Sequence, residues 1–215
     1  QTEVPPQRPL LMIRQNGTAG YIDQTGRLVI SPQFESARPF SEGLASARIG
    51  QKWGFIGESG KVFIQPQFDS AGDFTGEVAR VSVGEKWGFI DRSGKVLTGL
   101  QFDGARDFAE GFASVMVGKR WGAIDRAAIM IIKPQFDGLA EFSEGFAAFK
   151  QDDSCGYIDQ TGKRHIAAKF IHCYSFSEGL AWIPTERPRA NGWIWTPSPP
   201  PAVFGQSIPY SVKDS

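Results

Sequence analysis

A fixed step of 34 residues runs through this chain and restricts its fold more than any other feature. Three columns of residues keep this step: Gly20, Gly54, Gly88, Gly122 and Gly156; Phe34, Phe68, Phe102, Phe136 and Phe170; and Phe40, Phe74, Phe108, Phe142 and Phe176. No residue is inserted between the five copies. Such regularity predicts a repeat architecture in which neighbouring copies share one continuous core, with the two phenylalanine columns inside it.

The copies are predicted to be strands, although a period of 34 also fits helical repeats. The chain holds 25 glycines and 14 prolines, which leaves no uninterrupted window for paired helices. Residues 78–83 alternate instead, with Ala79, Val81 and Val83 on one side and Arg80 and Ser82 on the other. We therefore expect an all-β fold.

Each copy reads as a hairpin followed by a third strand. In the second copy, residues 45–49 and 53–56 form the hairpin, and residues 62–64 follow a turn at 58–61. The turn glycine supplies a positive φ, and a preceding aspartate can bond the turn amides. We expect the proline that comes next (Pro32, Pro66 and Pro134) to end the third strand, because it cannot donate into a ladder.

The ends of the chain suggest how the copies are arranged. Residues 10–22 and 180–194 each form a further hairpin in phase, so no hairpin is split between the termini. This favours stacked three-stranded units in an open twisted array, with a closed β-propeller-like ring as the alternative. We expect an N-terminal arm at 1–9 and a proline-rich tail at 196–215. Between them lies a single repeat domain at 10–195, with units starting near 20, 54, 88, 122 and 156 and a degenerate hairpin near 192.

The motif Lys-Trp-Gly-Phe-Ile at 52–56 and 86–90, with Arg-Trp-Gly-Ala-Ile at 120–124, resembles the WG (KWG) repeat family. The Pro-Gln-Phe-Asp and Phe-Ser-Glu-Gly segments also fit, and the resemblance covers residues 10–195. It implies a bacterial β-repeat protein, often exported, that binds other macromolecules and has no catalytic residues to transfer. Copies four and five are expected to be the least regular, since Ala128, Cys155 and Ala168 replace a turn glycine, the tryptophan and the proline.

Charge and hydropathy exclude several kinds of partner. The chain has 23 basic and 23 acidic residues, interspersed, so nothing favours nucleic acid or an anionic membrane. No apolar run approaches the roughly 18 residues of a membrane-spanning helix. The chain opens at Gln1 without methionine, which fits a processed protein, and we expect an extracytoplasmic (periplasmic or secreted) location.

The residues that could carry chemistry are better explained by structure. Recurrent acids are expected to cap turns rather than to form a calcium ladder: Asp23, Asp91, Asp125, Asp159, Glu42, Glu110, Glu144 and Glu178. His165, His172, Cys155 and Cys173 are expected in core or surface roles rather than as a zinc site or reactive thiol. No nucleophile motif or phosphate loop is present. We therefore expect no metal, no cofactor and no enzymatic activity.

Two classes of binding remain. Trp53, Trp87 and Trp121 are expected to pack against neighbouring copies rather than to stack on sugars. The candidate partner-binding residues lie near the carboxyl end: Trp182, Glu186, Arg187, Arg189, Trp193 and Trp195. We expect a non-catalytic protein-binding module that uses the variable hairpin tips and the loop at 185–191, such as an inhibitor, immunity protein or surface-complex component. The alternative is a glycan or cell-wall binder that uses exposed tryptophans.

Overall fold

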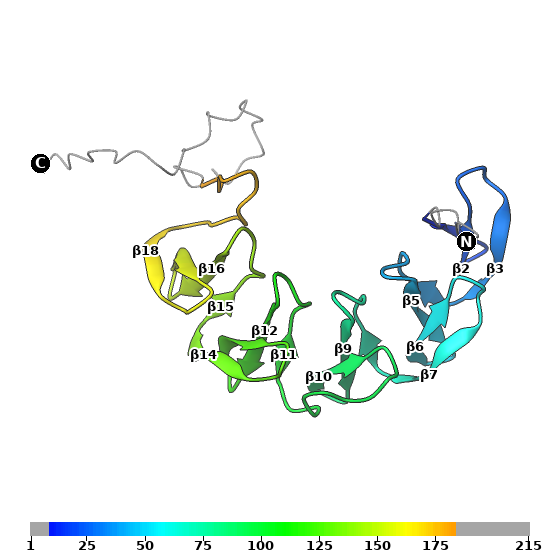
Figure 1. The fold of residues 1–215 in the computed structure, drawn as a ribbon, viewed down its shortest axis with the longest axis horizontal. Coiled ribbons are helices and arrows are strands. Elements are labelled where there is room, and N and C mark those ends of the chain that lie inside the picture. Colours follow the sequence, from blue (N-terminus) through cyan, green and yellow to red (C-terminus); the bar gives the residue numbers. More distant parts are fainter. Residues whose placement is uncertain (1–8, 184–215) are drawn as a thin grey trace, which may run out of the picture. The chain divides into compact units, whose positions relative to one another are not determined.

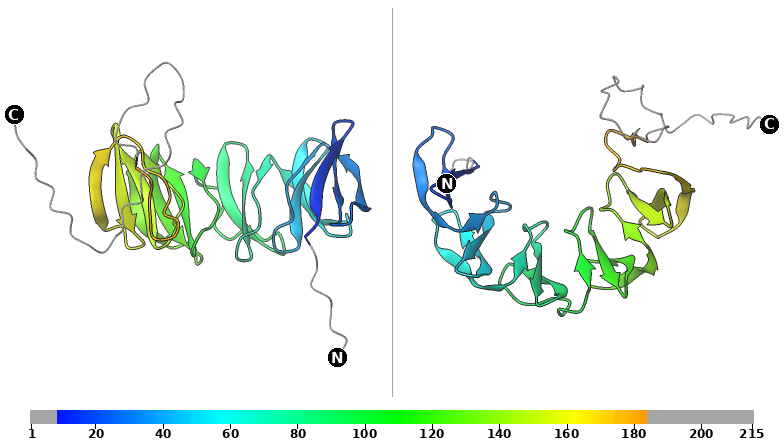
Figure 2. Two further views of the ribbon diagram at one scale, coloured as in Figure 1. Left: turned by 90° about the horizontal axis from the view of Figure 1, so that it is seen from above. Right: turned by 180° about the vertical axis from the view of Figure 1, so that it is seen from behind.

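The structure, a computed structural model, describes residues 9–183 and is built from β-strands (Figures 1 and 2). The chain divides into two compact units, Gln1–Gln135 and Phe136–Ser215. Within residues 9–183, no helix has the length and the apolar character that crossing a bilayer requires. The all-β prediction is confirmed for this part of the chain.

The repeating element is a small antiparallel sheet. The second sheet shows it fully, in the order β4 (Ser36–Ala37), β5 (Leu44–Ile49), β6 (Lys52–Gly57) and β7 (Val62–Phe68). The hairpin and third strand expected from the sequence are β5, β6 and β7. The two-residue strand β4 is additional, because two residues are too few to show an alternating pattern.

The other four sheets follow the same plan, each made of consecutive strands. Their strands are β1 (Leu11–Gln15), β2 (Thr18–Ile22) and β3 (Leu28–Phe34); β8 (Ser70–Ala71), β9 (Val78–Val83) and β10 (Lys86–Asp91); β11 (Gly104–Ala105), β12 (Phe112–Val117), β13 (Arg120–Asp125) and β14 (Met130–Phe136); and β15 (Gly138–Leu139), β16 (Phe146–Gln151), β17 (Ser154–Asp159) and β18 (Arg164–Phe170). Among the described residues, no sheet closes into a barrel, and none joins strands from both ends of the chain as a propeller closed by strand exchange would require.

The glycine of the Trp-Gly pair is required by a bulge in the next strand. Trp53 pairs with Phe68, and Phe55 pairs with Ile64. Between these two pairs, β7 therefore has two more residues than β6, which form the bulge. A Cβ on Gly54 would lie 2.5 Å from the Ile64 carbonyl oxygen. Our expectation that proline ends this strand is wrong: β7 runs through Pro66 to Phe68, because the bulge removes the proline nitrogen from the ladder.

The core lies between neighbouring sheets, as shared packing predicts. One buried cluster joins Phe55 and Phe68 of the second sheet to Phe74, Val81 and Ile90 of the third copy. Eight members of the two phenylalanine columns are buried: Phe34, Phe68, Phe102, Phe136, Phe74, Phe108, Phe142 and Phe176. A third aromatic column comes one residue after the glycine column and packs on the second phenylalanine column. The contacting pairs, with ring centroids 4.7–5.0 Å apart, are Tyr21–Phe40, Phe55–Phe74, Phe89–Phe108 and Tyr157–Phe176.

The third copy, rather than the fourth and fifth, departs most from the regular sheet. Its sheet has the order β10-β9-β8, and the segment 96–102 makes only the isolated bridges Ile90–Val96 and Trp87–Phe102. Thr98 takes the position of the buried Ile30, Ile64 and Ile132, and its hydroxyl accepts the Phe89 amide at 3.0 Å. In the fourth copy, by contrast, Ala128 adopts a φ of 63° and the turn is kept.

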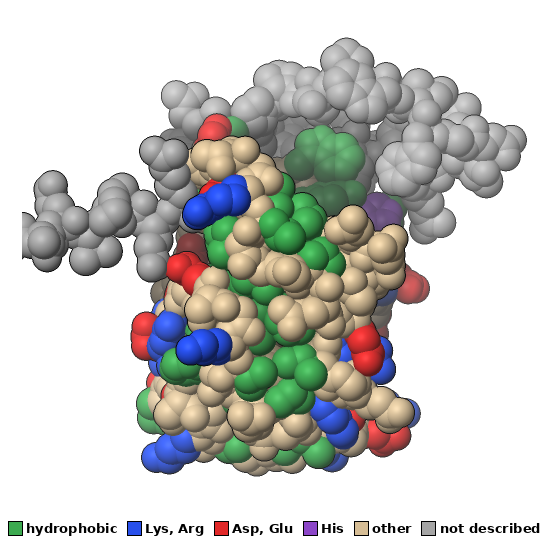
Figure 3. Space-filling model, turned by 90° about the vertical axis from the view of Figure 1, so that its right-hand side faces the viewer, with side chains coloured by type: hydrophobic (Ala, Val, Ile, Leu, Met, Phe, Trp, Pro, Cys, Tyr) green, Lys and Arg blue, Asp and Glu red, His purple; other side chains and the backbone are tan. Residues whose placement is uncertain are grey.

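The last strand of a copy also carries apolar side chains at the surface. Phe63 is 58% exposed, and Val62 beside it is 39% exposed. The equivalent exposed residues are Leu28, Val29, Val96, Leu97, Met130 and Ile131. Hydrophobic side chains run along the middle of the face that carries β3 and β7, with charged side chains at its margins (Figure 3).

At the carboxyl end, the hairpin expected over 180–194 lies largely outside the described residues. The structure shows its beginning, a turn in which Ser177 and Leu180 bond each other through their backbones.

Candidate functional site

The Ser-Glu-Gly turns bring recurrent carboxylates to the junctions between copies. Ser41 and Leu44 exchange backbone hydrogen bonds, while Glu42 and Gly43 have φ of 53° and 79°, as a type I′ turn requires. Glu77, Glu110, Glu144 and Glu178 also have positive φ. Because Gly76 and Glu77 both adopt positive φ, the inverted Gly-Glu order in the third copy leaves the turn intact.

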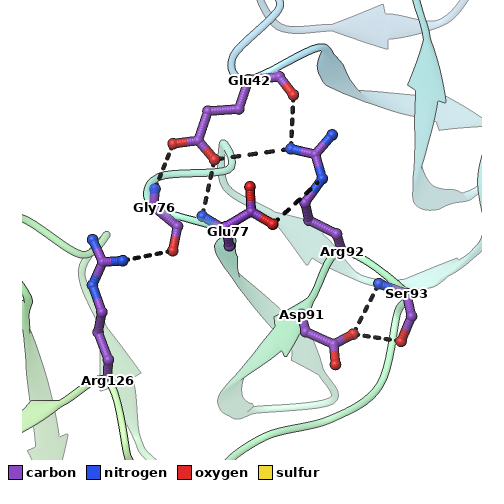
Figure 4. A network of polar contacts seen from close by, with 7 residues as sticks. All are labelled: Glu42, Gly76, Glu77, Asp91, Arg92, Ser93 and Arg126. Carbon is purple, nitrogen blue, oxygen red and sulfur yellow. Dashed lines mark hydrogen bonds and ion pairs between the residues drawn. The ribbon is translucent and has the colours of Figure 1, made fainter.

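Two of these glutamates, Glu42 and Glu144, cap the turn of the next copy, as Figure 4 shows for Glu42. The Glu42 carboxylate accepts hydrogen bonds from the amides of Gly76 at 2.5 Å and Glu77 at 2.9 Å. The Ser41 hydroxyl donates to the Phe74 carbonyl at 2.6 Å. In the second unit, Glu144 accepts the Gly179 amide at 2.7 Å, and Ser143 donates to Phe176 at 2.7 Å. For Glu42 and Glu144 the expected turn capping is thus found, but between copies rather than within one.

Arginines 50 residues further along the chain complete this network. Arg92 donates to the Glu42 carbonyl at 2.7 Å, and its guanidinium lies 3.8 Å from the Glu77 carboxylate. Arg126 donates to the Gly76 carbonyl at 2.9 Å. The acids are therefore used in holding turns together, which leaves them poorly placed to act as a ligand ladder.

The aspartates of the Asp-x-(Ser/Thr)-Gly turns cap their own turns. Asp159 accepts the amides of Thr161 and Lys163, and the Thr161 hydroxyl at 2.6 Å. This hydroxyl, with help from His165 and the amides, lowers the pKa of Asp159 to about 2. Asp23, Asp91 and Asp125 make equivalent amide contacts. In the described part of the chain, no group of three or more His, Cys, Asp or Glu side chains is arranged to hold a metal ion.

The hairpin tips combine fixed backbones with exposed side chains. Asp69 accepts the Gly84 amide at 2.7 Å, and Asp103 accepts the Gly118 amide at 2.7 Å. Asp69 and Asp103 also bond Lys52 and Lys86 of the preceding strands at 2.5 Å, which lowers the pKa of both carboxyls. The tip side chains Gln51, Glu85 and Lys119 are exposed. A partner would meet a surface whose backbone is held in place.

The tryptophans of the Trp-Gly pairs are half-buried and covered, as expected. Trp53 and Trp87 pack against the buried clusters between sheets. Arg80 lies over the Trp87 ring at 5.1 Å, and Arg106 lies over the Trp121 ring at 5.2 Å. These rings are therefore engaged by the protein itself.

A buried carboxylate oxygen without a partner marks a difference between two equivalent junctions. Arg80 bonds Asp107 at 2.7 Å, and both side chains are mostly buried. One copy earlier, Ser46 occupies the position of Arg80 and Asp73 that of Asp107, and Arg38 reaches Asp73 only at 3.9 Å. Asp73 Oδ1 and Ser46 Oγ are the buried side-chain oxygens that lack a hydrogen-bond partner among the described residues. Burial raises the pKa of Asp73.

The two cysteines form a disulfide, which corrects our expectation of a cysteine in a simple core role. Cys155 and Cys173 are bonded, with their Cα atoms 6.0 Å apart and a sequence separation of 18. Cys155 takes the place of the tryptophan, so the bond fastens β17 to the segment after β18. The sequence signal that could have predicted this bond is the presence of both cysteines in the same copy. His165 has other partners than the cysteines: it bonds Asp159 at 2.9 Å, and its ring packs against Phe146.

Of the candidate partner-binding residues, Trp182 alone is described, and it lies at the surface. It is 49% exposed, and its ring centroid is 4.9 Å from that of Tyr174, which is also 49% exposed. Ile171 nearby in sequence is 45% exposed. Glu186, Arg187, Arg189, Trp193 and Trp195 lie outside the described residues. Tyr174 was not predicted from the sequence, because the equivalent positions of the other copies are not aromatic.

The fold and these junctions define a tandem β-repeat protein whose copies are joined by a shared aromatic core and a ladder of turn caps. A family model described as WG containing repeat matches residues 20–53, 53–87, 87–121, 121–155 and 156–183. The chain belongs to the WG repeat family.

Comparisons beyond the family are distant. No curated protein matches the chain in sequence. A crystal structure of a eukaryotic initiation factor is similar at 12% identity and a TM-score of 0.48, over 78% of this chain and 55% of that one, so this chain spans about half its length. A plant albumin from Cicer arietinum, described as showing hemagglutination, is similar at 13% identity and a TM-score of 0.27, over 63% of this chain and 91% of that one.

Proposed function

We propose that this protein is a non-catalytic binding module that captures a protein partner through its carboxyl-terminal copy and hairpin tips. Membership of the WG repeat family supports a binding module in general. The regular copies also support this role, because their core residues repeat from copy to copy while the residues at their hairpin tips differ, as in repeat proteins that present a binding surface.

The exposed pair Tyr174 and Trp182 carries the proposal. Among the described residues at the carboxyl end, these two rings each present about half of their area, and the exposed Ile171 lies three residues before Tyr174 in sequence. By contrast, the Trp53, Trp87 and Trp121 column is packed or covered by arginine. Exposed aromatic side chains with an apolar neighbour are typical anchors of protein interfaces.

The Cys155–Cys173 bond supports the location proposed for this function. Disulfides persist in oxidising compartments such as the periplasm and the extracellular space, and are rare in the cytosol. We place the module in an extracytoplasmic compartment, in the role of an inhibitor, immunity protein or surface-complex component. Fractionation of the native host with an antibody against the chain tests this location, and a purely cytosolic signal would refute it.

The experiment that tests the binding role begins with the native host. The chain is immobilised, a captured protein is identified, and its affinity for purified variants is measured by calorimetry. Tyr174→Ser with Trp182→Ser should weaken binding at least tenfold, as should a Gly-Ser linker in place of residues 185–191. Leu11→Ser, which changes a side chain 52% exposed at the other end of the described chain, is the matched control and should bind normally.

Glycan binding is the outcome that would replace this proposal. If no protein is captured, soluble cell-wall oligosaccharides are titrated while tryptophan fluorescence is followed. Protection of fluorescence that disappears in Trp182→Ser would identify the same rings as a sugar platform.

A further inference from the structure

The last segment of each of the first four copies presents apolar side chains that the fold does not use. We define the apolar stripe as residues 28–29, 62–63, 96–97 and 130–131, all within the unit Gln1–Gln135. Its members are 37–58% exposed. Figure 3 shows hydrophobic side chains along the middle of this face where it carries β3 and β7.

Strand formation does not explain the stripe. In the third copy the outer strand is absent from the sheet, yet Val96 and Leu97 remain apolar and exposed. In the fifth copy the outer strand β18 forms, although Arg164 and His165 stand at the stripe positions. The apolar pair is therefore neither required by the strand nor sufficient for it. Contiguous exposed apolar surface with a polar rim is typical of an interaction site.

The charge beside the stripe indicates the kind of partner. The four segments 27–33, 61–67, 95–101 and 129–135 contain no acidic residue, although the chain as a whole is neutral. Each contains one basic residue: Arg27, Lys61, Lys95 and Lys133. Arg27 bonds Asp23 at 3.1 Å, but its side chain is 80% exposed. The other margin carries exposed amides: Gln33, Gln67, Gln101 and Gln135.

We propose that the apolar stripe binds a protein segment that combines acidic with aliphatic or aromatic side chains. The apolar residues bury its hydrophobic side chains, the basic residues Arg27, Lys61, Lys95 and Lys133 pair with its carboxylates, and the glutamines bond its backbone. A second copy of this chain is disfavoured, because two stripes would oppose like charges. A lipid surface is the alternative occupant, and the vesicle experiment below tests it. The proposal rests on the proposed binding role but uses a different surface.

The test uses a defined probe, a phage library of random dodecapeptides selected against the full chain. Enriched peptides should combine Asp or Glu with Leu, Phe or Trp, and a fluorescein-labelled consensus peptide should bind with an affinity that falls as salt is raised. The variant Val29→Ser/Phe63→Ser/Leu97→Ser should bind this peptide at least tenfold more weakly. Lys61→Glu/Lys95→Glu should weaken it similarly and reduce the salt dependence.

Two controls separate this surface from others. Val83→Ser/Val117→Ser removes side chains of similar exposure, 40% and 43%, from hairpin ends and should not change peptide binding. Tyr174→Ser/Trp182→Ser should also bind the peptide normally, so failure of the proposed carboxyl-terminal site leaves this result standing. Circular dichroism and urea unfolding confirm that each variant is folded.

The proposal is overturned if no peptide is enriched, if enriched peptides lack acids, or if folded stripe variants bind as well as the original chain. Co-sedimentation with phosphatidylcholine vesicles containing phosphatidylserine should show no binding. Vesicle binding that is lost in the stripe variant, without peptide binding, would assign the stripe to a membrane surface instead.

Discussion

At the scale of single residues, each junction between copies depends on a few polar atoms whose partners lie about one repeat away. Glu42 is the best defined, since both of its carboxylate oxygens accept backbone amides from the next copy. Glu77 is the glutamate of the same turn one copy later, one position further on because the Gly-Glu order is inverted, and its side chain is 74% exposed. The two residues therefore provide a matched comparison within one protein.

We expect Glu42→Ala to lower the free energy of unfolding by about 1.5–3 kcal/mol, because amides lose charge-assisted hydrogen bonds. Glu77→Ala, as the control, should cost less than about 0.5 kcal/mol, as is usual for surface sites. Urea unfolding followed by tryptophan fluorescence measures both. Equal losses in the two variants would show that the turn caps do not join the copies.

Asp73 should make stability depend on pH in the opposite direction from the turn aspartates. Its folded pKa is raised by burial, so its contribution is most favourable below the unfolded pKa and is lost as pH rises through the folded pKa. Asp73→Asn removes this loss. The variant should therefore gain stability relative to the original chain between pH 3 and pH 7, measured by urea unfolding at both values. A constant difference between the two proteins would contradict the raised pKa.

Phe102 of the first phenylalanine column and Phe63 of the apolar stripe allow a comparison of a buried and an exposed ring. Phe102 is 4% exposed, whereas Phe63 is 58% exposed. We expect Phe102→Ala to cost roughly 3–5 kcal/mol as a large-to-small core change. Phe63→Ala should cost less than about 1 kcal/mol, so thermal unfolding should separate the two variants clearly.

At the scale of elements, the segment 96–102 shows what a regular outer strand needs. Ile64 of β7 is buried, and its carbonyl lies over Gly54, whereas the third copy has Thr98, Gly99 and Leu100 in place of Ile64, Gln65 and Pro66. The Thr98 hydroxyl takes the Phe89 amide. A single hydroxyl thus competes with the backbone ladder and replaces part of it.

Exchanging three residues should restore the missing strand. In Thr98→Ile/Gly99→Gln/Leu100→Pro, the Phe89 amide regains a backbone acceptor and the side chain at 98 gains the buried site of Ile64. We expect slower amide hydrogen exchange at Phe89 and a higher midpoint of urea unfolding. Unchanged exchange at Phe89 would mean that other residues of this copy prevent the strand.

At the scale of the whole molecule, the 34-residue step allowed the fold class to be predicted from the sequence but not the places where single copies depart from it. The all-β class, the family and the buried columns followed from the glycine and phenylalanine spacing, because a regular core repeats its residues. The bulge at Pro66 and the lost strand at Thr98 were not predictable from alternation, since each depends on how one backbone meets another. The disulfide was missed because substitution of one column by cysteine looks like substitution by any small apolar residue.

The disulfide gives the two compact units different responses to reduction. Cys155 and Cys173 both lie in Phe136–Ser215, and the unit Gln1–Gln135 contains no cysteine. Cys155→Ala/Cys173→Ala should destabilise the second unit by about 2–4 kcal/mol, as loss of a comparable loop constraint does. Limited proteolysis with and without dithiothreitol should show faster cleavage after residue 136 only. Equal protection in both conditions would refute this.

The proline inside the outer strand bears on how such a chain avoids becoming a fibre. Tandem copies place nearly identical strands at high local concentration, the condition under which exposed edges recruit one another into cross-β assemblies. Pro32, Pro66 and Pro134 remove a donor from three of these edges. Where the proline is missing, the third copy forms no outer strand, and the fifth carries Arg164 and Lys169 on its strand. Along the described part of this chain, each outer strand therefore either is absent or carries a proline or charged side chains that oppose edge-to-edge pairing.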